Sequence, residues 1–152
     1  MSSSFSPERL PDAYWNRRVR NGEILYGALG IDRKDKAARL AWIHENFQFF
    51  GAPVGLLFFM EKGFGQSQWM DMGIYLQTIM LLLREAGLDS CPQADWATFE
   101  RTVCAHLAVP DNLTLICGMA VGYRDAAAPI NIATTERDDP VLILQGNPDS
   151  GT

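Results

Sequence analysis

Cysteine, positive charge and long apolar runs are all scarce in this sequence of 152 residues. Its three cysteines, Cys91, Cys104 and Cys117, are odd in number and widely spaced. That pattern argues against a disulfide framework and against a zinc site. No metal site is therefore predicted, and we expect reduced thiols in a cytoplasmic protein.

Positive charge is the second scarcity. Thirteen Lys and Arg face eighteen Asp and Glu, which gives a net charge of −5. Nucleic acid is not an expected partner, because binding its phosphates requires clustered positive charge. The one basic run, residues 17–20, is interpreted as a solvated helix end.

Membrane and export signals are also missing from the pattern. No apolar run approaches the roughly 20 residues that cross a bilayer. The opening residues lack the apolar stretch of a secretory signal. We therefore expect no membrane association.

The sequence shows no catalytic constellation. His44 and His106 fall in helical stretches, and their spacing implies no Ser, Cys or carboxylate partner. The glycines of residues 63–65 and 118–122 are too sparse for a phosphate-binding loop. No catalytic side chain is predicted, and acid–base chemistry by either histidine ranks last among the hypotheses.

What the sequence does have is the composition of one globular domain. Apolar residues make up 47% and charged residues 20%, which is ordinary for a protein that buries a core without disulfides. We expect a single domain over residues 1–152, loose at residues 1–12 and 146–152. Helical and strand patterns interleave, which indicates a mixed α+β layer fold.

In the first half, a short helix is predicted around residues 14–20, followed by a glycine-punctuated segment. Asp32 is the expected cap of the next helix. That helix carries a predicted buried stripe at steps of three and four, formed by Leu40, Ile43, Phe47 and Phe50. The apolar run of residues 53–60 then indicates a buried strand.

In the second half, residues 113–121 indicate another buried strand, preceded by a turn at residues 110–112. Residues 126–131 are predicted to be a loop, and residues 141–144 form a short apolar patch. Asp95 is expected to cap a helix whose inner stripe comprises Trp96, Phe99, Val103 and Leu107.

The helix predicted over residues 68–86 is apolar on nearly all sides. Such a helix is either a core helix or a membrane span, and Asp71, Gln77 and Arg84 interrupt it too often for a span. We expect it to be buried in part by a partner subunit. Gly87 and Leu88 predict a Schellman stop at its end.

The next segment, residues 88–95, links this helix to an amphipathic one. Pro92 stiffens it, and backbone amides beside a helix start can bind an electron-rich group. By spacing alone, a plain helix–helix connector is the favoured interpretation.

An ordered series of motifs changes that weighting. From about Pro11 to Arg137 the chain resembles the FMN-dependent nitroreductase family. The matching pieces are Phe50-Gly-Ala-Pro-Val-Gly-Leu56, Gln68-Trp-Met-Asp-Met-Gly-Ile-Tyr-Leu-Gln77, Gly87-Leu-Asp-Ser-Cys-Pro-Gln93, Val109-Pro-Asp111, Cys117-Gly-Met-Ala-Val-Gly-Tyr123, Ala128-Pro-Ile-Asn131 and Thr135-Glu-Arg137.

The resemblance implies a mainly antiparallel sheet flanked by helices, in an intertwined homodimer that holds FMN between its subunits. It places the backbone of Pro92, Gln93 and Ala94 against the isoalloxazine ring. It also places Arg137, and less strongly Thr135, at the FMN phosphate, where a fork-shaped guanidinium suits a phosphate.

The implied activity is that of an oxidoreductase, in which NAD(P)H reduces FMN and FMN reduces a nitroaromatic or quinone-like acceptor. Family members also carry an N-terminal Arg-Arg-Ser-x-Arg type motif for the phosphate, so we expect a shortened member. Residues 17–20 resemble that motif superficially, but their spacing places them in the middle connection. The alternative is a non-catalytic dimerisation or ligand-binding remnant that retains little flavin.

Overall fold

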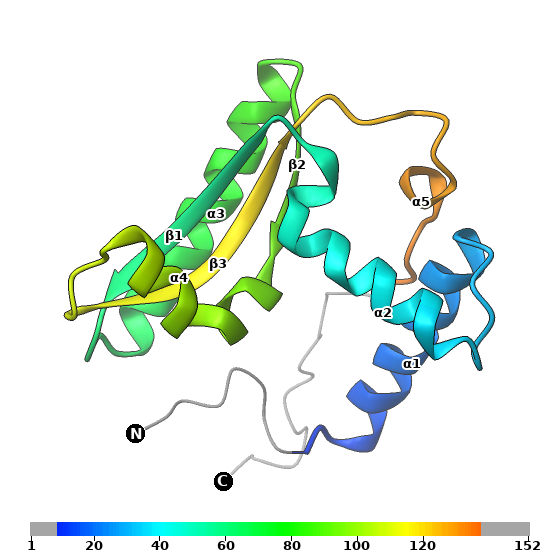
Figure 1. The fold of residues 1–152 in the computed structure, drawn as a ribbon, viewed down its shortest axis with the longest axis horizontal. Helices are drawn as coiled ribbons and strands as arrows, with labels where there is room; N and C mark the ends of the chain where they lie inside the picture. Colours follow the sequence, from blue (N-terminus) through cyan, green and yellow to red (C-terminus); the bar gives the residue numbers. More distant parts are fainter. Residues whose placement is uncertain (1–8, 138–152) are drawn as a thin grey trace, which may run out of the picture.

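The computed structural model describes residues 9–137, which form three strands, helices that pack against them and helices that extend away from them (Figure 1). Among these residues, no helix is long and apolar enough to cross a membrane. In chain order the elements are α1 (Asp12–Ala28), α2 (Lys36–His44), the 3-10 helix η1 (Glu45–Gly51), β1 (Val54–Glu61), α3 (Gln66–Glu85), β2 (Asp89–Gln93), the 3-10 helix η2 (Ala94–Phe99), α4 (Glu100–Leu107), β3 (Leu113–Gly122) and α5 (Pro129–Ile132).

The three strands form an antiparallel sheet in the order β1-β3-β2. The two strands expected from apolar runs are confirmed as β1 and β3, and β3 lies at the centre. The third strand was not expected, because residues 88–95 were interpreted as a helix connector. Pairing decides the outcome: Asp89 lies opposite Gly122 and Gln93 opposite Gly118, so backbone hydrogen bonds to β3 make this segment a strand.

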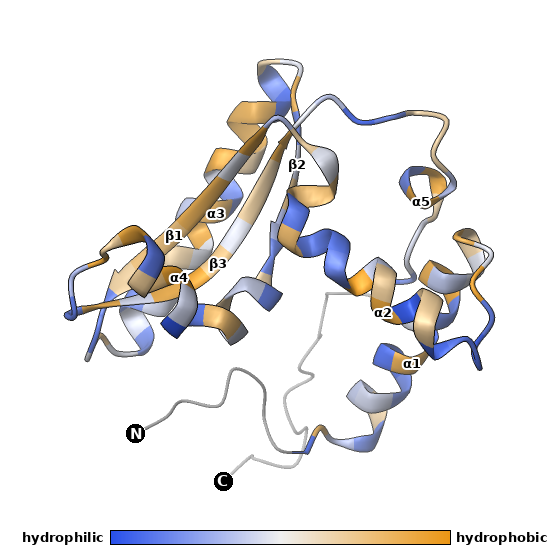
Figure 2. Ribbon diagram, in the orientation of Figure 1, coloured by the Kyte–Doolittle hydropathy of each residue, from blue (hydrophilic) through white to orange (hydrophobic). Residues whose placement is uncertain are grey.

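One face of the sheet is covered by α3, which confirms the predicted central helix (Figure 1). Figure 2 shows how strongly apolar both α3 and β1 are. The core joins Phe58, Cys117, Met119 and Val121 to partly buried residues of α3, among them Met72, Leu76, Ile79, Met80 and Leu83.

The end of α3 is the predicted Schellman stop. The Leu88 amide donates to the carbonyl of Leu83 at 2.8 Å, and the Gly87 amide donates to that of Arg84 at 3.1 Å. Gly87 has a φ of 78°, a left-handed conformation that glycine adopts without a Cβ clash. Leu88 therefore turns back onto the core beside Leu83.

The opposite face of the sheet is covered by aromatic side chains from η1 and η2. Trp96 stacks on Phe49 with 4.9 Å between the ring centroids, and Phe47 meets both Trp96 and Phe99 edge-on. Trp96 lies over Gly118 and Phe49 over Gly55, so closely that neither glycine could carry a side chain without a shift. The two glycines make room for this aromatic layer.

The first two helices extend away from the sheet (Figure 1). Helix α1 runs without a break through Gly22 and Gly27, so the short helix predicted around residues 14–20 is too short. Its glycines cost helix stability but do not end the helix. The cap of α2 is Asp35, whose carboxylate accepts from the Ala38 amide at 2.9 Å, and the predicted cap Asp32 instead accepts from the Lys34 amide in a turn.

The predicted buried stripe of α2 and η1 is largely wrong for the described chain. Leu40, Ile43 and Phe50 are exposed and no residue of α2 is buried, because no described element covers that face. Arg39 lies over the ring of Tyr26 at 4.4 Å, which ties α2 to α1.

The helix after β2 also differs from expectation. Residues 94–99 form η2, and α4 begins only at Glu100, where the side chain of Asp95 provides no cap hydrogen bond. Of the predicted inner stripe, Val103 is buried while Phe99 and Leu107 are exposed. The predicted loop at residues 126–131 contains the start of α5, and residues 141–144 and 146–152 lie outside the described residues.

Candidate functional site

The segment Pro92, Gln93, Ala94 lies where β2 ends and η2 begins. Because β2 is an edge strand, its outer backbone groups have no strand partner in the described chain. Pro92 suits this edge since it has no N–H to contribute. Pro92 and Ala94 are exposed on either side of Gln93, which is buried with 2% of its surface exposed.

The side chain of Gln93 joins β2 to η1. Its Nε2 donates to the backbone carbonyl of Asn46 at 2.7 Å, across 47 positions of sequence. Its Oε1 and the indole Nε1 of Trp96 are buried without hydrogen-bond partners in the described chain. The sequence indicated only a backbone role for Gln93, and nothing in the motif reveals this second contact.

The turn that receives this hydrogen bond is strained. Phe49 and Phe50 have φ values of 51° and 53°, a left-handed region that costs a residue with a side chain on the order of 1–2 kcal/mol. The stacking of Phe49 on Trp96 offsets part of that cost. The end of β2 and the start of η2, which expose the Pro92–Ala94 backbone, thus pack against a strained turn.

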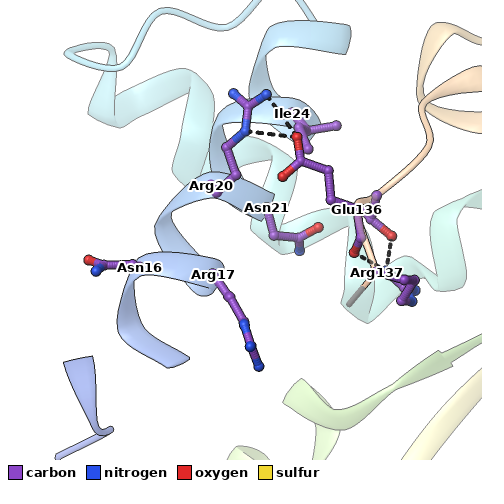
Figure 3. Close-up of a pocket in the computed structure, with 8 residues that line it drawn as sticks. Asn16, Arg17, Arg20, Asn21, Ile24, Glu136 and Arg137 are labelled. Carbon is purple, nitrogen blue, oxygen red and sulfur yellow. Dashed lines mark hydrogen bonds and ion pairs between the residues drawn. The ribbon is translucent and has the colours of Figure 1, made fainter. Parts of the chain in front are cut away.

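The other predicted residues, Thr135 and Arg137, lie together in a separate pocket of about 420 Å³ beside α1 (Figure 3). The Arg137 guanidinium donates to the Thr135 hydroxyl and, at 3.0 Å, to the Glu136 carbonyl. The pocket lining consists of Asn16, Arg17, Arg20, Asn21, Ile24, Thr135, Glu136 and Arg137.

Part of the basic run of α1 therefore belongs to the same pocket as Arg137. Arg20 Nη2 lies 3.1 Å from Glu136 Oε1, and the hydrogen bond and charge of Glu136 raise the pKa of the Arg20 guanidinium. The sequence interpretation of residues 17–20 as a solvated helix end missed this proximity. No local signal could have found it, because 116 positions separate Arg20 from Glu136.

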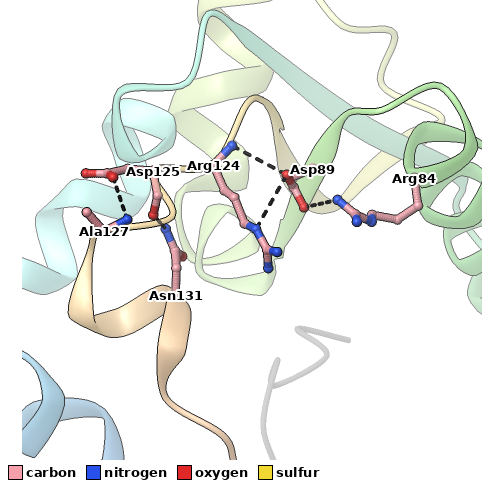
Figure 4. A network of polar contacts seen from close by, with 6 residues as sticks. All are labelled: Arg84, Asp89, Arg124, Asp125, Ala127 and Asn131. Atoms are coloured by element: carbon pink, nitrogen blue, oxygen red, sulfur yellow. Dashed lines mark hydrogen bonds and ion pairs between the residues drawn. The ribbon is translucent and has the colours of Figure 1, made fainter.

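Two aspartates, Asp89 and Asp125, form hydrogen bonds with the segment that leads from β3 to this pocket (Figure 4). The Asp89 carboxylate binds Arg84 and accepts from the backbone amide of Arg124 at 3.4 Å. Asp125 accepts from the Ala127 amide at 2.8 Å, and its carbonyl accepts from the Asn131 side chain at 2.8 Å. These contacts link the start of β2 to the segment that carries Thr135 and Arg137.

The structure does not bring the two predicted groups into one pocket. None of residues 92–94 lines the pocket of Arg137, and Figure 1 shows α5 and the segment after it beside α1, away from β2. His44 and His106 are exposed, and residues 9–137 contain no cluster of three or more potential metal ligands. Within the part of the chain that the structure describes, neither histidine forms a hydrogen bond or an ion pair that would support an acid–base site.

The nitroreductase family model matches residues 23–123. Among curated proteins, the chain is 39% identical over 132 residues to a 4-nitrobenzoate reductase of Pseudomonas putida, covering 87% of this chain and 58% of that protein. It is 33% identical over 134 residues to a chloronitrobenzene nitroreductase of Comamonas testosteroni, covering 88% of this chain and 59% of that one. The chain thus spans under two thirds of these relatives.

Solved structures agree in fold. The FMN and NADPH-dependent nitroreductase NfnB from Sphigopyxis sp. strain HMH superimposes with a TM-score of 0.89 at 43% identity, covering 95% of this chain and 66% of that one. The FMN-dependent NfnB from Mycobacterium smegmatis, solved with NADPH, gives a TM-score of 0.85 at 32% identity, covering 94% and 67%. The expected α+β fold with an antiparallel sheet and flanking helices is confirmed.

Proposed function

Because the chain belongs to the nitroreductase family, we propose that it acts as an FMN-dependent oxidoreductase. Reduced nicotinamide, NADH or NADPH, is the proposed electron donor, and a nitroaromatic or quinone-like small molecule is the proposed acceptor. When bound, FMN supplies the redox chemistry by taking a hydride from the donor and reducing the acceptor. The protein supplies binding, orientation and electrostatics.

The residues present fit a flavin in two respects. The free edge of β2 offers backbone groups on a rigid strand, with Pro92 and Ala94 exposed, and a flat ring with polar edges can hydrogen-bond there. The pocket of Arg137 offers guanidinium and amide donors, which suit a phosphate. Beneath that exposed backbone, Gln93 Oε1 and Trp96 Nε1 are buried without a hydrogen-bond partner among the described residues.

The role of each site residue follows from those chemistries. The backbone of Pro92, Gln93 and Ala94 orients the ring and hydrogen-bonds its edge. Arg137 holds the phosphate by charge-assisted hydrogen bonds, and Thr135 keeps the guanidinium in place through its hydroxyl. No side chain needs to act as a nucleophile in this proposal, because a bound flavin would carry the redox chemistry.

We further propose that two copies of the chain complete the site. The separation of the two groups of site residues within one chain supports this arrangement, since a second copy can bring one group toward the other. The outer face of α3 supports it as well, because Ile74, Leu81 and Leu82 are 65%, 60% and 57% exposed. Three free cysteines fit the proposed cytoplasmic location.

The observation that carries the proposal is the free β2 edge at Pro92–Ala94 in a fold that matches FMN-dependent nitroreductases at a TM-score of 0.89. The purified chain should be mixed with FMN and passed through gel filtration, followed by a nicotinamide oxidation assay. Flavin absorption that elutes with a dimer and supports nicotinamide oxidation is the expected result. Colourless protein that dimerises would overturn the proposal in favour of a flavin-poor dimerisation remnant.

A further inference from the structure

Gln93 is the one polar residue among residues 9–137 that the fold buries. A buried amide group must find hydrogen-bond partners or lose stability. Gln93 satisfies its amide nitrogen by donating to the Asn46 carbonyl at 2.7 Å, but its Oε1 has no partner in the described chain. With one of its two polar atoms unpaired, the Gln93 side chain contributes little net stability. Its main effect is therefore on geometry, because it fixes the distance between β2 and η1.

The partner of Gln93 belongs to the strained turn. Asn46 sits in η1 and donates from its own side chain to the Ile43 carbonyl at 3.0 Å, which fixes the start of that turn. The turn then enters the left-handed region at Phe49 and Phe50. A strained turn keeps its shape only when its surroundings hold it. The contacts around this turn include the Gln93 hydrogen bond and the aromatic contacts of η1 with Trp96 and Phe99.

Because Gln93 lies at the end of β2, its side-chain hydrogen bond can hold the exposed residues on either side of it. Its neighbours Pro92 and Ala94 are exposed, while Gln93 points inward. Gln93 also pairs with Gly118, over which Trp96 lies. The end of β2 is therefore held by its pairing with β3 and, from inside, by one buried side chain, while its outer edge has no strand neighbour in the described chain.

We propose that Gln93 is a positioning residue, whose buried amide clamps the end of β2 to η1 and so fixes the exposed backbone of Pro92 and Ala94 against the flavin ring. The inference rests on the proposed function for the identity of the ring. It adds a side-chain role to a residue whose motif indicated only a backbone contact. Gln93 acts through its neighbours and does not itself touch the reacting atoms with its side chain.

The test compares Gln93→Met, which keeps the length of the side chain but removes the donor, with wild type. Gln48→Met is the matched control, because Gln48 lies in the same turn with an exposed side chain. Hydrogen exchange of FMN-free protein should show residues 44–51 and 92–96 exchanging roughly tenfold faster in Gln93→Met, as expected for one lost hydrogen bond. Amides of β1 and β3 should stay unchanged, and Gln48→Met should match wild type throughout.

FMN binding is measured next by quenching of flavin fluorescence. Gln93→Met should raise the FMN dissociation constant by roughly tenfold and alter the visible flavin spectrum, because the exposed backbone loses its fixed position. Its urea midpoint should stay close to that of wild type, since the substitution also removes the orphaned Oε1. A loss of affinity without a matching loss of stability separates positioning from a purely structural role.

Gln93→Glu gives a second, independent readout. A protonated glutamic acid can donate to the Asn46 carbonyl, whereas a carboxylate cannot, and burial raises the pKa of such a group. Relative to wild type in the same buffers, its FMN affinity should fall as the pH rises through that pKa. If the FMN affinity of Gln93→Glu relative to wild type did not change with pH, the proposed role of the Gln93–Asn46 hydrogen bond would be contradicted.

The outcomes separate the two ideas. If wild type binds no FMN, the proposed function is overturned and this inference falls with it. If wild type binds FMN but Gln93→Met exchanges and binds like Gln48→Met, only the inference is overturned. Faster exchange with unchanged FMN affinity would show a hydrogen bond that holds the turn but does not position the site, which also overturns it.

Discussion

Among the glycines of residues 9–137, Gly118 is one of those that leave almost no room for a side chain. A Cβ added there would lie 2.3 Å from Trp96 Cδ1 and 2.7 Å from Trp96 Nε1. The indole cannot simply move aside, because it stacks on Phe49 and meets Phe47 edge-on. We therefore expect Gly118→Ala to lower the free energy of unfolding by about 1–3 kcal/mol, the usual cost of overpacking a core.

A double-mutant cycle isolates the cause. Trp96→Leu removes the indole atoms that approach Gly118. In that background Gly118→Ala should be neutral or stabilising by up to about 1 kcal/mol, because glycine in a strand interior is less stable than alanine by that amount. The coupling between the two positions should then be about 1–4 kcal/mol, the difference between the costs in the two backgrounds.

Urea unfolding followed by far-UV circular dichroism is the suitable assay, because tryptophan fluorescence would change with the substitution itself. Protein concentration must be held fixed, since association would contribute to the measured stability. Gly73→Ala is the control: a Cβ there meets nothing within 4 Å in the described chain, so no loss is expected. An equal cost of Gly118→Ala in both backgrounds would refute the steric explanation.

Three further predictions follow from individual side chains. Arg137→Ala should weaken FMN binding by about 1.5–3 kcal/mol, the scale of a charge-assisted hydrogen bond, and unchanged affinity in a fluorescence titration would remove Arg137 from the site. Gly87→Ala should cost about 1–2 kcal/mol in thermal unfolding because φ is 78° there, whereas an undiminished melting temperature would contradict a left-handed cap. Burial raises the pKa of the Cys117 thiol, so iodoacetamide near neutral pH should label it only after unfolding, and mass spectrometry showing labelling of native protein would contradict its buried position.

The parts of the fold that were predictable have strong local patterns. The helix α3, its Schellman stop and the strands β1 and β3 follow from apolar runs and from Gly87. Predictions from local sequence were wrong where contacts with distant segments, or the tolerance of a helix for glycine, decided the structure. β2 became a strand because β3 offered a partner, and α1 continued through Gly22 because two glycines lower helix stability without ending a helix.

The candidate site divides in the same way. The ordered motifs identified Pro92, Gln93, Ala94, Thr135 and Arg137, and their place in an FMN site stays a prediction. Nothing in those motifs indicated that Gln93 reaches Asn46. These contacts join segments that are distant in sequence, so no spacing rule can report them.

The sequence by itself determined which segments are apolar, where glycine ends a helix, and which family the order of motifs resembles. The first two depend on residues within a few positions of one another, where backbone geometry and side-chain periodicity act directly, and the third depends on short motifs and their order along the chain. Only the tertiary structure decided that residues 89–93 form an edge strand, that Trp96 lies over Gly118, and that Arg20 meets Glu136. Those outcomes depend on hydrogen bonds and packing between distant segments, which come into contact only when the chain is folded.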